Sequence, residues 1–260
     1  MMIDIHCHIL PNIDDGSSSM ETSIEMARIA LEDGIKFIIA TPHYIEYEHE
    51  IPREAILKNC QELNQLLIQK GIELKILPGA EVFISPTIVE SYKKGKIISL
   101  NDGRKYILIE LPVATYPEYT EDIIFEFKVM GITPIIAHIE RYFYVKDDFE
   151  LVFRLINKGA LIQVNSTSVM GLFGKEVKNK SIDLIKHRLV HFIASDAHTT
   201  RGRVPKISEA LEILRKERVD ESYIDYILIN SQKVVRGEEI EILDPIKKKV
   251  KWFYKLKRRF

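Results

Sequence analysis

The sequence predicts an α/β fold in which seven short parallel strands and their connecting helices form a distorted, TIM-like (β/α)7 barrel. Each predicted strand is a continuous run of Ile, Leu and Val, as in strands whose two faces are both covered. Segments with a helical spacing of apolar residues separate these runs. Ionisable residues follow six of the runs, and in a parallel barrel these carboxyl ends meet on the face that carries active sites.

The size and composition of the chain suit one large domain. It has 260 residues, of which 46% are hydrophobic and 29% are charged, and we expect the barrel to span residues 1–245. We find no run of about 18 apolar residues and no basic leader before the first strand. We therefore expect no membrane-spanning segment, no signal peptide and a cytoplasmic location.

A basic, aromatic tail is expected at residues 246–260. Residues 247–260 hold eight Lys or Arg and no acid, which leaves 29 basic against 38 acidic residues in the rest of the chain. Such a segment could lie on an anionic membrane surface. A solvated extension, or a helix packed on the body, explains it equally well.

The apolar runs and their flanking residues give the elements in order. The first strand begins at Ile3, and the later strands are predicted at 36–40, 73–77, 106–110, 133–138, 161–165 and 190–196. Ser18-Ser19-Met20-Glu21 fits a capping box, which predicts a first helix that stops at Gly34. The other helices are predicted at 52–71, 86–93, a stretch ending at Gly131, 148–158, 175–187, 205–217 and 220–230.

The first strand contains Ile-Asp-Ile-His-Cys-His. Residues two apart in an extended segment share a face, so His6 and His8 should point the same way while Cys7 points the other. Asp14 and Asp15 follow in a turn rich in Pro, Asn, Asp and Gly. The pattern indicates a chelating site to which one of the two aspartates contributes, and the spacing leaves both open.

Further imidazole and carboxylate groups stand at or just past the ends of apolar strands, where burial is costly without a metal or a partner. Any one of them alone is explained as a turn residue, a strand-end charge or a helix cap. Their common position at one end of a barrel favours a metal centre. They are His43, Glu81, Glu110, His138, Asp196 and His198. The remaining histidines, His49, His187 and His191, lack this placement, and we interpret them as surface or packing residues.

Several motifs, taken as a set over about residues 1–240, resemble one superfamily. They are Ile-Asp-Ile-His-Cys-His, Asp-Asp-Gly, Thr-Pro-His-Tyr, Pro-Gly-Ala-Glu, Leu-Ile-Glu-Leu, Ile-Ala-His-Ile-Glu-Arg-Tyr, Gln-Val-Asn-Ser and Ala-Ser-Asp-Ala-His. The chain is similar to the PHP (polymerase and histidinol phosphatase) superfamily. Within it, the chain most resembles the bacterial manganese-dependent tyrosine-protein phosphatases of capsule and exopolysaccharide operons. The resemblance implies a PHP barrel with a site for three metal ions.

The same resemblance implies how the ligands are shared. His6, His8, Glu81 and Asp196 would hold one ion. Glu81 would bridge to a second ion held with Glu110 and His138. Asp15, His43 and His198 would hold the third, so the resemblance favours Asp15 over Asp14. Ligands that mix imidazole with carboxylate suit manganese, iron or zinc, and manganese is the ion that the resemblance implies.

The predicted reaction is hydrolysis of phosphotyrosine. We hypothesise that a hydroxide shared by two metal ions attacks phosphorus. Arg141 and Arg203 follow the ligands His138 and His198 closely, and both are placed to bind phosphate oxygens as planar forks. In the resembled family the substrate is a membrane-associated bacterial tyrosine kinase, which we expect as the partner here.

Three alternatives differ in chemistry. A cysteine-dependent tyrosine phosphatase needs C-x₅-R, but Ile13 follows Cys7 and Leu66 follows Cys60 at the required distance. A small-molecule phosphoesterase similar to histidinol phosphatase would use the same barrel and metals. A nucleic-acid-processing PHP module is disfavoured because the body is acidic and has no basic aromatic groove, so we expect no nucleic acid partner.

Overall fold

Parallel strands form the centre of the molecule. The structure, a computed structural model, describes residues 1–146 and 149–246. Within these residues the strands pair in parallel in two sheets, of order β1-β2-β4 and β3-β5-β6-β7-β8-β9. Their bounds are β1 Met2–Cys7, β2 Ile35–Ala40, β3 His43–Tyr44, β4 Lys75–Pro78, β5 Glu81–Phe83, β6 Tyr106–Glu110, β7 Thr133–Ile136, β8 Leu161–Asn165 and β9 Phe192–Ala194.

Two of the predicted strands, 36–40 and 73–77, each continue after a break into a second short strand that was not predicted. β2 and β3 are separated only by Thr41 and Pro42, and β4 and β5 only by Gly79 and Ala80. Since β2 pairs with β4 and β3 pairs with β5, the broken strands pass from one sheet into the other. A Cβ on Gly79 would lie 2.8 Å from Ile39 Cγ2, so the break brings two strands too close for a side chain. The predicted seven strand positions are therefore present, two of them bent.

The sheet curls until its last strand meets its first. The N–H of Asp196, just after β9, donates to the carbonyl of His6 at 2.8 Å, and the N–H of His8 donates to the carbonyl of Ala197 at 2.8 Å. A parallel bridge joins Cys7 to Ala197. These contacts confirm the predicted fold class, a distorted barrel of parallel strands.

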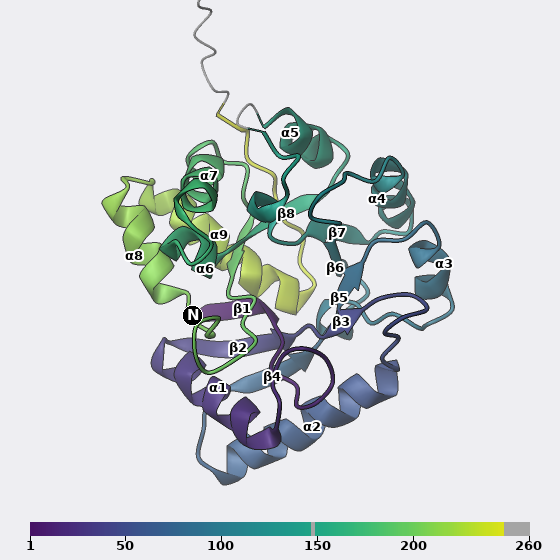
Figure 1. Cartoon of the computed structure of the whole chain (residues 1–260), viewed down its shortest axis with the longest axis vertical. Coiled ribbons are helices and arrows are strands. Elements are labelled where there is room, and N and C mark those ends of the chain that lie inside the picture. The colour runs from purple at the N-terminus through teal and green to yellow at the C-terminus, as the bar shows by residue number, and fades with distance from the viewer. Residues whose placement is uncertain (147–148, 247–260) are drawn as a thin grey trace, which may run out of the picture.

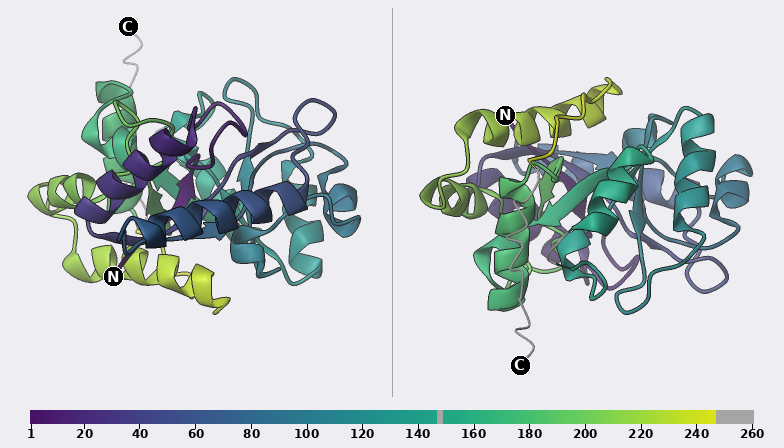
Figure 2. Two further views of the ribbon diagram at one scale, coloured as in Figure 1. Left: turned by 90° about the horizontal axis from the view of Figure 1, so that it is seen from below. Right: turned by 90° about the horizontal axis from the view of Figure 1, so that it is seen from above.

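Helices surround the strands on all sides in the view of Figure 1. α9 runs along one end of the barrel beside the start of the chain (Figure 2), where Gln232 donates to the carbonyl of Met1. The helices are α1 Met20–Glu32, α2 Arg53–Gln69, α3 Ile88–Lys93, α4 Thr120–Val129, α5 Glu150–Asn157, α6 Ser166–Met170, α7 Lys175–Lys186, α8 Ser208–Lys216 and α9 Glu221–Arg236, with short 3₁₀ turns η1 Leu100–Asp102 and η2 Ile139–Arg141.

The helices differ from the predicted ones at several boundaries, and one helix was not predicted. α1 is capped by Ser19, whose hydroxyl accepts from the N–H of Thr22 at 3.1 Å, so the cap lies one residue later than the predicted capping box. α9 continues past the predicted end at residue 230 to Arg236, where Gly237 ends it with a φ of 67°. α6 was not predicted, because Ser and Thr dominate its five residues and these are poor helix signals.

Apolar side chains fill the barrel below its functional face. This inner cluster draws Ile5 from β1, Leu108 from β6 and Phe192 from β9, and Val234 of α9 joins it. A larger outer cluster packs the helices onto the strands. None of the helices within 1–146 and 149–246 is long and apolar enough to cross a membrane. The predicted tail at 246–260 lies outside the described residues except for Ile246.

Candidate metal centre

The two histidines of the first motif lie side by side, as the strand alternation predicts. β1 is irregular between Asp4 and Cys7, and His6 Nε2 ends 3.3 Å from His8 Nε2. Both rings are buried. Cys7 faces the outer core instead. Two ring nitrogens aimed at the same small space form the start of a chelating site.

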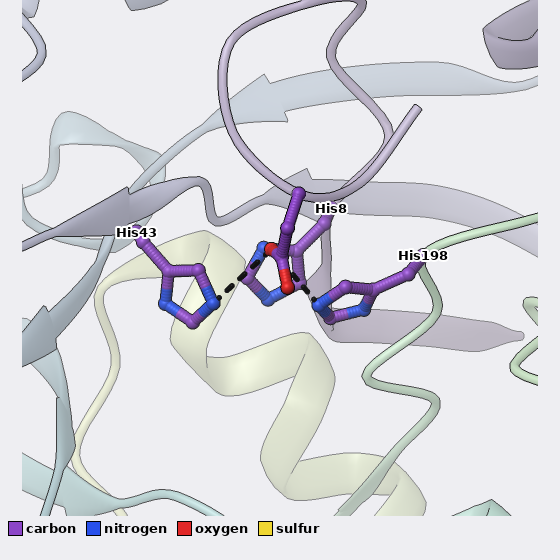
Figure 3. Close-up of side chains that lie close together, drawn as sticks. His8, His43 and His198 are labelled. Carbon is purple, nitrogen blue, oxygen red and sulfur yellow. Dashed lines mark ion pairs between the residues drawn. The ribbon is translucent and has the colours of Figure 1, made fainter. Parts of the chain in front are cut away.

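Asp14 and Asp15 occupy different places around these rings. Asp14 Oδ2 lies 2.6 Å from His8 Nδ1, the ring nitrogen that faces away from the cluster. It also accepts from the N–H of His43 at 3.1 Å. Asp15 Oδ1 instead lies 3.3 Å from Nε2 of His43 and 3.3 Å from Nε2 of His198. Figure 3 shows these two rings on either side of His8. Asp15 thus has the position of a ligand, and Asp14 that of a group that orients His8.

The loop that carries both aspartates folds back tightly on β1. A Cβ on Gly16 would lie 2.2 Å from the carbonyl oxygen of His8, so only glycine fits there. The N–H of Gly16 donates to Asp14 Oδ1 at 3.0 Å. This close return fixes Asp14 against the imidazole that it orients.

Three groups of potential ligands form a continuous cluster. In each group one ligand atom per residue lies within 4.8 Å of all the others. The groups share members, which is the arrangement that neighbouring ions need. The groups are His8, Asp15, His43 and His198; His6, His8, Glu81 and Asp196; and His43, Glu81 and Glu110.

The ninth predicted ligand, His138, lies beside the third group. Its Nε2 is 3.0 Å from Glu81 Oε1 and 3.5 Å from Glu110 Oε1. His138 follows β7 with a φ of 28°, and Asp196 follows β9 with a φ of 51°. Both backbones are left-handed, a conformation that is uncommon for residues with side chains. The strain falls where two strands turn their last polar side chains into the cluster.

Burial and charge both act on the acids of the cluster. Burial would raise the pKa of Glu81, but His6 and His138 hold that pKa well below its usual range. Burial and the adjacent Glu81 raise the pKa of Glu110 to about 7. Burial and the neighbouring His8 lower the pKa of His198 to about 4. Acids and imidazoles packed this closely away from water fit divalent cations, which would neutralise the carboxylates and occupy the imidazole lone pairs.

Both predicted phosphate-binding arginines reach the cluster. Arg141 Nη1 lies 3.3 Å from Asp196 Oδ2, and Arg203 Nη2 lies 2.7 Å from the same oxygen. The guanidinium of Arg141 also lies over the ring of Phe173, 4.8 Å from its centre. Each arginine is 27% exposed, so each guanidinium borders both the buried cluster and solvent.

Four buried polar residues behind the ligands were not assigned any role from the sequence. Asp4 accepts from the N–H and hydroxyl of Ser195. Gln163, Asn165 and Glu140 form hydrogen bonds beneath His6, His138 and Asp196. For Asp4, Gln163 and Asn165 the signal that could have found them is a polar residue inside an apolar strand, since burial there requires partners. Glu140 lies in η2 and gives no such signal.

The remaining histidines lie outside the ligand groups. His191 is buried, and its Nδ1 accepts from the N–H of Ile162 at 3.1 Å. His187 Nδ1 lies 2.7 Å from the carbonyl of Asp183. His49 is closer to the site than we predicted: its Nε2 lies 2.9 Å from the carbonyl of Ile13. It also lines a cavity of about 600 Å³ that borders Asp15 and His43.

A barrel of parallel strands with imidazoles and carboxylates gathered at their carboxyl ends defines the class of metal-dependent barrel hydrolases. The chain belongs to the CpsB/CapC family of capsular polysaccharide synthesis, whose family model matches residues 2–236.

Relatives of the chain are tyrosine-protein phosphatases by name. The tyrosine-protein phosphatase YwqE of Bacillus subtilis is 41% identical over 92% of this chain and 93% of its own length. The putative tyrosine-protein phosphatase CapC of Staphylococcus aureus is 36% identical over 97% of this chain and 99% of its own length. Among solved structures, YwqE and CpsB of Streptococcus pneumoniae are described as unique metal-dependent tyrosine phosphatases. That match has a TM-score of 0.90 at 39% identity and covers 95% of this chain and 100% of the other.

Proposed function

We propose that this chain is a metal-dependent protein-tyrosine phosphatase that acts in the control of capsule or exopolysaccharide synthesis. The observation that carries the proposal is the convergence of nine imidazole and carboxylate side chains: eight form shared ligand groups, and the ninth, His138, contacts Glu81 and Glu110 beside them. The family to which the chain belongs and the names of its relatives support the same activity.

We further propose that the cluster holds three divalent ions and that these are manganese, with iron or zinc as alternatives. His6, His8, Glu81 and Asp196 would hold the first, Glu81, Glu110 and His138 the second, and Asp15, His43 and His198 the third. Divalent ions in such a site lower the pKa of water and withdraw charge from a phosphoryl group.

Arg141 and Arg203 are proposed as the groups that bind the phosphate. Each guanidinium is a planar fork that can donate two hydrogen bonds to phosphate oxygens. Their shared contact with Asp196 Oδ2 holds both forks at the edge of the cluster before substrate arrives. Because the forks are already oriented there, they can stabilise the charge that builds on the phosphoryl oxygens during transfer.

The cysteines are not expected to act as nucleophiles. Burial raises the pKa of the Cys7 thiol well above its usual range, and burial raises the pKa of Cys60 to about 12. A nucleophilic cysteine must be a thiolate near neutral pH. Both thiols therefore stay protonated in the folded protein.

The proposal is tested by comparing two substrates and two treatments. The wild-type protein and a Cys7→Ala/Cys60→Ala variant should both hydrolyse a phosphotyrosyl peptide, and excess chelator should abolish the activity of both. Added Mn²⁺ should restore it. Activity that survives chelator but disappears in the variant would contradict the metal mechanism. Faster turnover of histidinol phosphate than of the peptide would favour the small-molecule alternative.

We also propose a partner and a location. The partner would be the phosphorylated tyrosine kinase at a bacterial membrane, and residues 246–260, separate from a barrel at 1–245, would attach the enzyme to anionic lipid from the cytoplasmic side. Removing the residues after Ile246 should weaken sedimentation with phosphatidylserine vesicles and leave peptide hydrolysis unchanged. Equal sedimentation of the full chain and the truncated chain would overturn the membrane part.

A further inference from the structure

Two amides in β8 connect ligands from three different strands. Gln163 and Asn165 are two residues apart, so they share a face of the strand, and both are fully buried. The residues between and beside them, Ile162 and Val164, belong to the outer apolar core. Paired amides in an otherwise apolar strand cost free energy unless every polar atom finds a partner.

One backbone group determines which side-chain atom of Gln163 is the oxygen and which is the nitrogen. The N–H of His138 can only donate, and it lies 2.8 Å from the Gln163 side-chain atom that must therefore be the oxygen, Oε1. His6 Nδ1 lies 3.2 Å from the same oxygen. Since that oxygen can only accept, His6 Nδ1 must carry a proton, and in the neutral ring the lone pair is left on Nε2.

That lone pair points at two other members of the group formed by His6, His8, Glu81 and Asp196. His6 Nε2 lies 3.1 Å from Glu81 Oε2 and 3.3 Å from Asp196 Oδ1. The hydrogen bond behind the ring thus selects the tautomer whose free nitrogen faces the cluster.

The hydrogen bonds of the two amides lead on, donor to acceptor, from Gln163 to Asp196. Gln163 Nε2 donates to Asn165 Oδ1 at 2.8 Å, which leaves Asn165 Nδ2 to donate to Asp196 Oδ2 at 2.7 Å. The two arginines bind the same oxygen, Oδ2. Asp196 Oδ1 is the oxygen that faces His6 and His8. Three donors therefore hold one oxygen of the carboxylate and present the other to the cluster.

We propose that Gln163 and Asn165 form a polar relay that sets the tautomer of His6 and the orientation of Asp196, which makes both amides positioning residues for the ion held by His6, His8, Glu81 and Asp196. The inference rests on the metal centre proposed above. The relay starts from the N–H of His138, whose left-handed backbone directs that group at Gln163.

The first test measures the affinity for Mn²⁺ directly, by calorimetric titration of the metal-free full chain. Gln163→Met keeps the volume and removes the hydrogen bonds, and Asn165→Leu does the same at the second amide. Each should weaken Mn²⁺ binding at the site of His6, His8, Glu81 and Asp196 about 10- to 100-fold, as is typical when a partner behind a metal ligand is lost. Ile162→Val is the matched control, because it truncates the opposite face of the same strand, and its affinity should equal that of the wild type.

The second test needs no variant at the amides, so it stands even if those variants fail to fold. In wild-type protein loaded with diamagnetic Zn²⁺ and labelled with ¹⁵N-histidine, the ring of His6 should show a protonated Nδ1 and a metal-bound Nε2. His6→Gln identifies the signal by its loss.

The outcomes separate the relay from the proposed function. If Gln163→Met and Asn165→Leu bind Mn²⁺ as tightly as the wild type does, the relay is wrong and the metal centre stands. A His6 ring protonated at Nε2 would have the same consequence. Wild type that binds no divalent ion would overturn both the relay and the metal centre.

Discussion

Asp14 and Asp15 are neighbours in sequence, yet they face opposite nitrogens of the surrounding rings. Asp14 contacts His8 Nδ1, behind the ring, and burial would raise its pKa, but the hydrogen bond with His8 lowers that pKa to about 2. Asp15 is largely exposed and faces the Nε2 atoms of His43 and His198. Since only the second position is open to an ion, the two carboxylates should respond differently to substitution.

Asp15→Ala should lower the metal content of the saturated protein by one ion per chain, because the group of His43 and His198 loses its only carboxylate. Asp14→Asn should keep the full content but weaken the affinity about 10- to 100-fold, because His8 is less firmly oriented. Elemental analysis after dialysis and a chelator competition check both. The reverse pattern would assign the ligand role to Asp14.

For single residues, the sequence predicts the candidate ligands better than it predicts the residues that orient them. Residues at strand ends could be placed because parallel strands all end on one face. The choice between Asp14 and Asp15 came only from the resemblance, since a turn directs adjacent side chains in ways that spacing does not specify. Gln163 and Asn165 had no assigned role, because the sequence does not say which buried atoms meet them.

Among the elements, the edge strand β4 depends on a single side chain of α2. Asn64 Nδ2 donates to the carbonyl of Ile76 and Asn64 Oδ1 accepts from the N–H of Ile76, both at 2.8 Å. β4 pairs with β2 on its other side. Asn64 thus replaces a missing neighbouring strand at this point of the edge.

Asn64→Leu should lower the free energy of unfolding by about 2–3 kcal/mol, because two hydrogen bonds are lost and two backbone groups are left without partners. Asn59→Leu, on the same helix, is the control: Asn59 donates to the carbonyl of Ala55 one turn earlier, and its loss should cost about 0.5 kcal/mol or less. Urea unfolding of the two variants measures the difference. Equal losses would mean that the contact with β4 contributes no stability of its own.

β8 and β9 are linked by a buried imidazole that should make stability depend on pH. His191 accepts from the N–H of Ile162, and burial lowers its pKa from 6.5 to about 3. Between these values the unfolded chain binds a proton and the folded chain does not, so stability rises with pH. The contribution lost on going from pH 7 to pH 5 should be about 2 kcal/mol.

His191→Asn keeps an acceptor near the position of Nδ1 and removes the titrating group. Between pH 7 and pH 5 the free energy of unfolding should fall in both proteins. The fall in the variant should be smaller than the fall in the wild type, and the difference should be about 2 kcal/mol. Urea titrations at several pH values measure both proteins under the same conditions. Parallel curves would show that His191 does not titrate differently in the two states.

For the whole molecule, the closure of the barrel brings together candidate ligands that lie far apart in sequence. β1 carries His6 and His8, and the segment after β9 carries Asp196 and His198, yet backbone hydrogen bonds join these two ends. The fold class followed from apolar runs and their spacing, which depend on local chemistry. The breaks at Pro42 and Gly79 did not follow, because they arise from packing between distant strands. The short helix α6 did not follow because its Ser and Thr residues are poor helix signals.

The central claim is that nine side chains surround divalent ions at the carboxyl end of the barrel. Anomalous diffraction at the manganese edge, from crystals of the full chain loaded with Mn²⁺, tests it most directly. We expect three separate peaks, each in contact with one of the three proposed sets of ligands. Crystals that show no peak there, or peaks bound only by other residues, would contradict it.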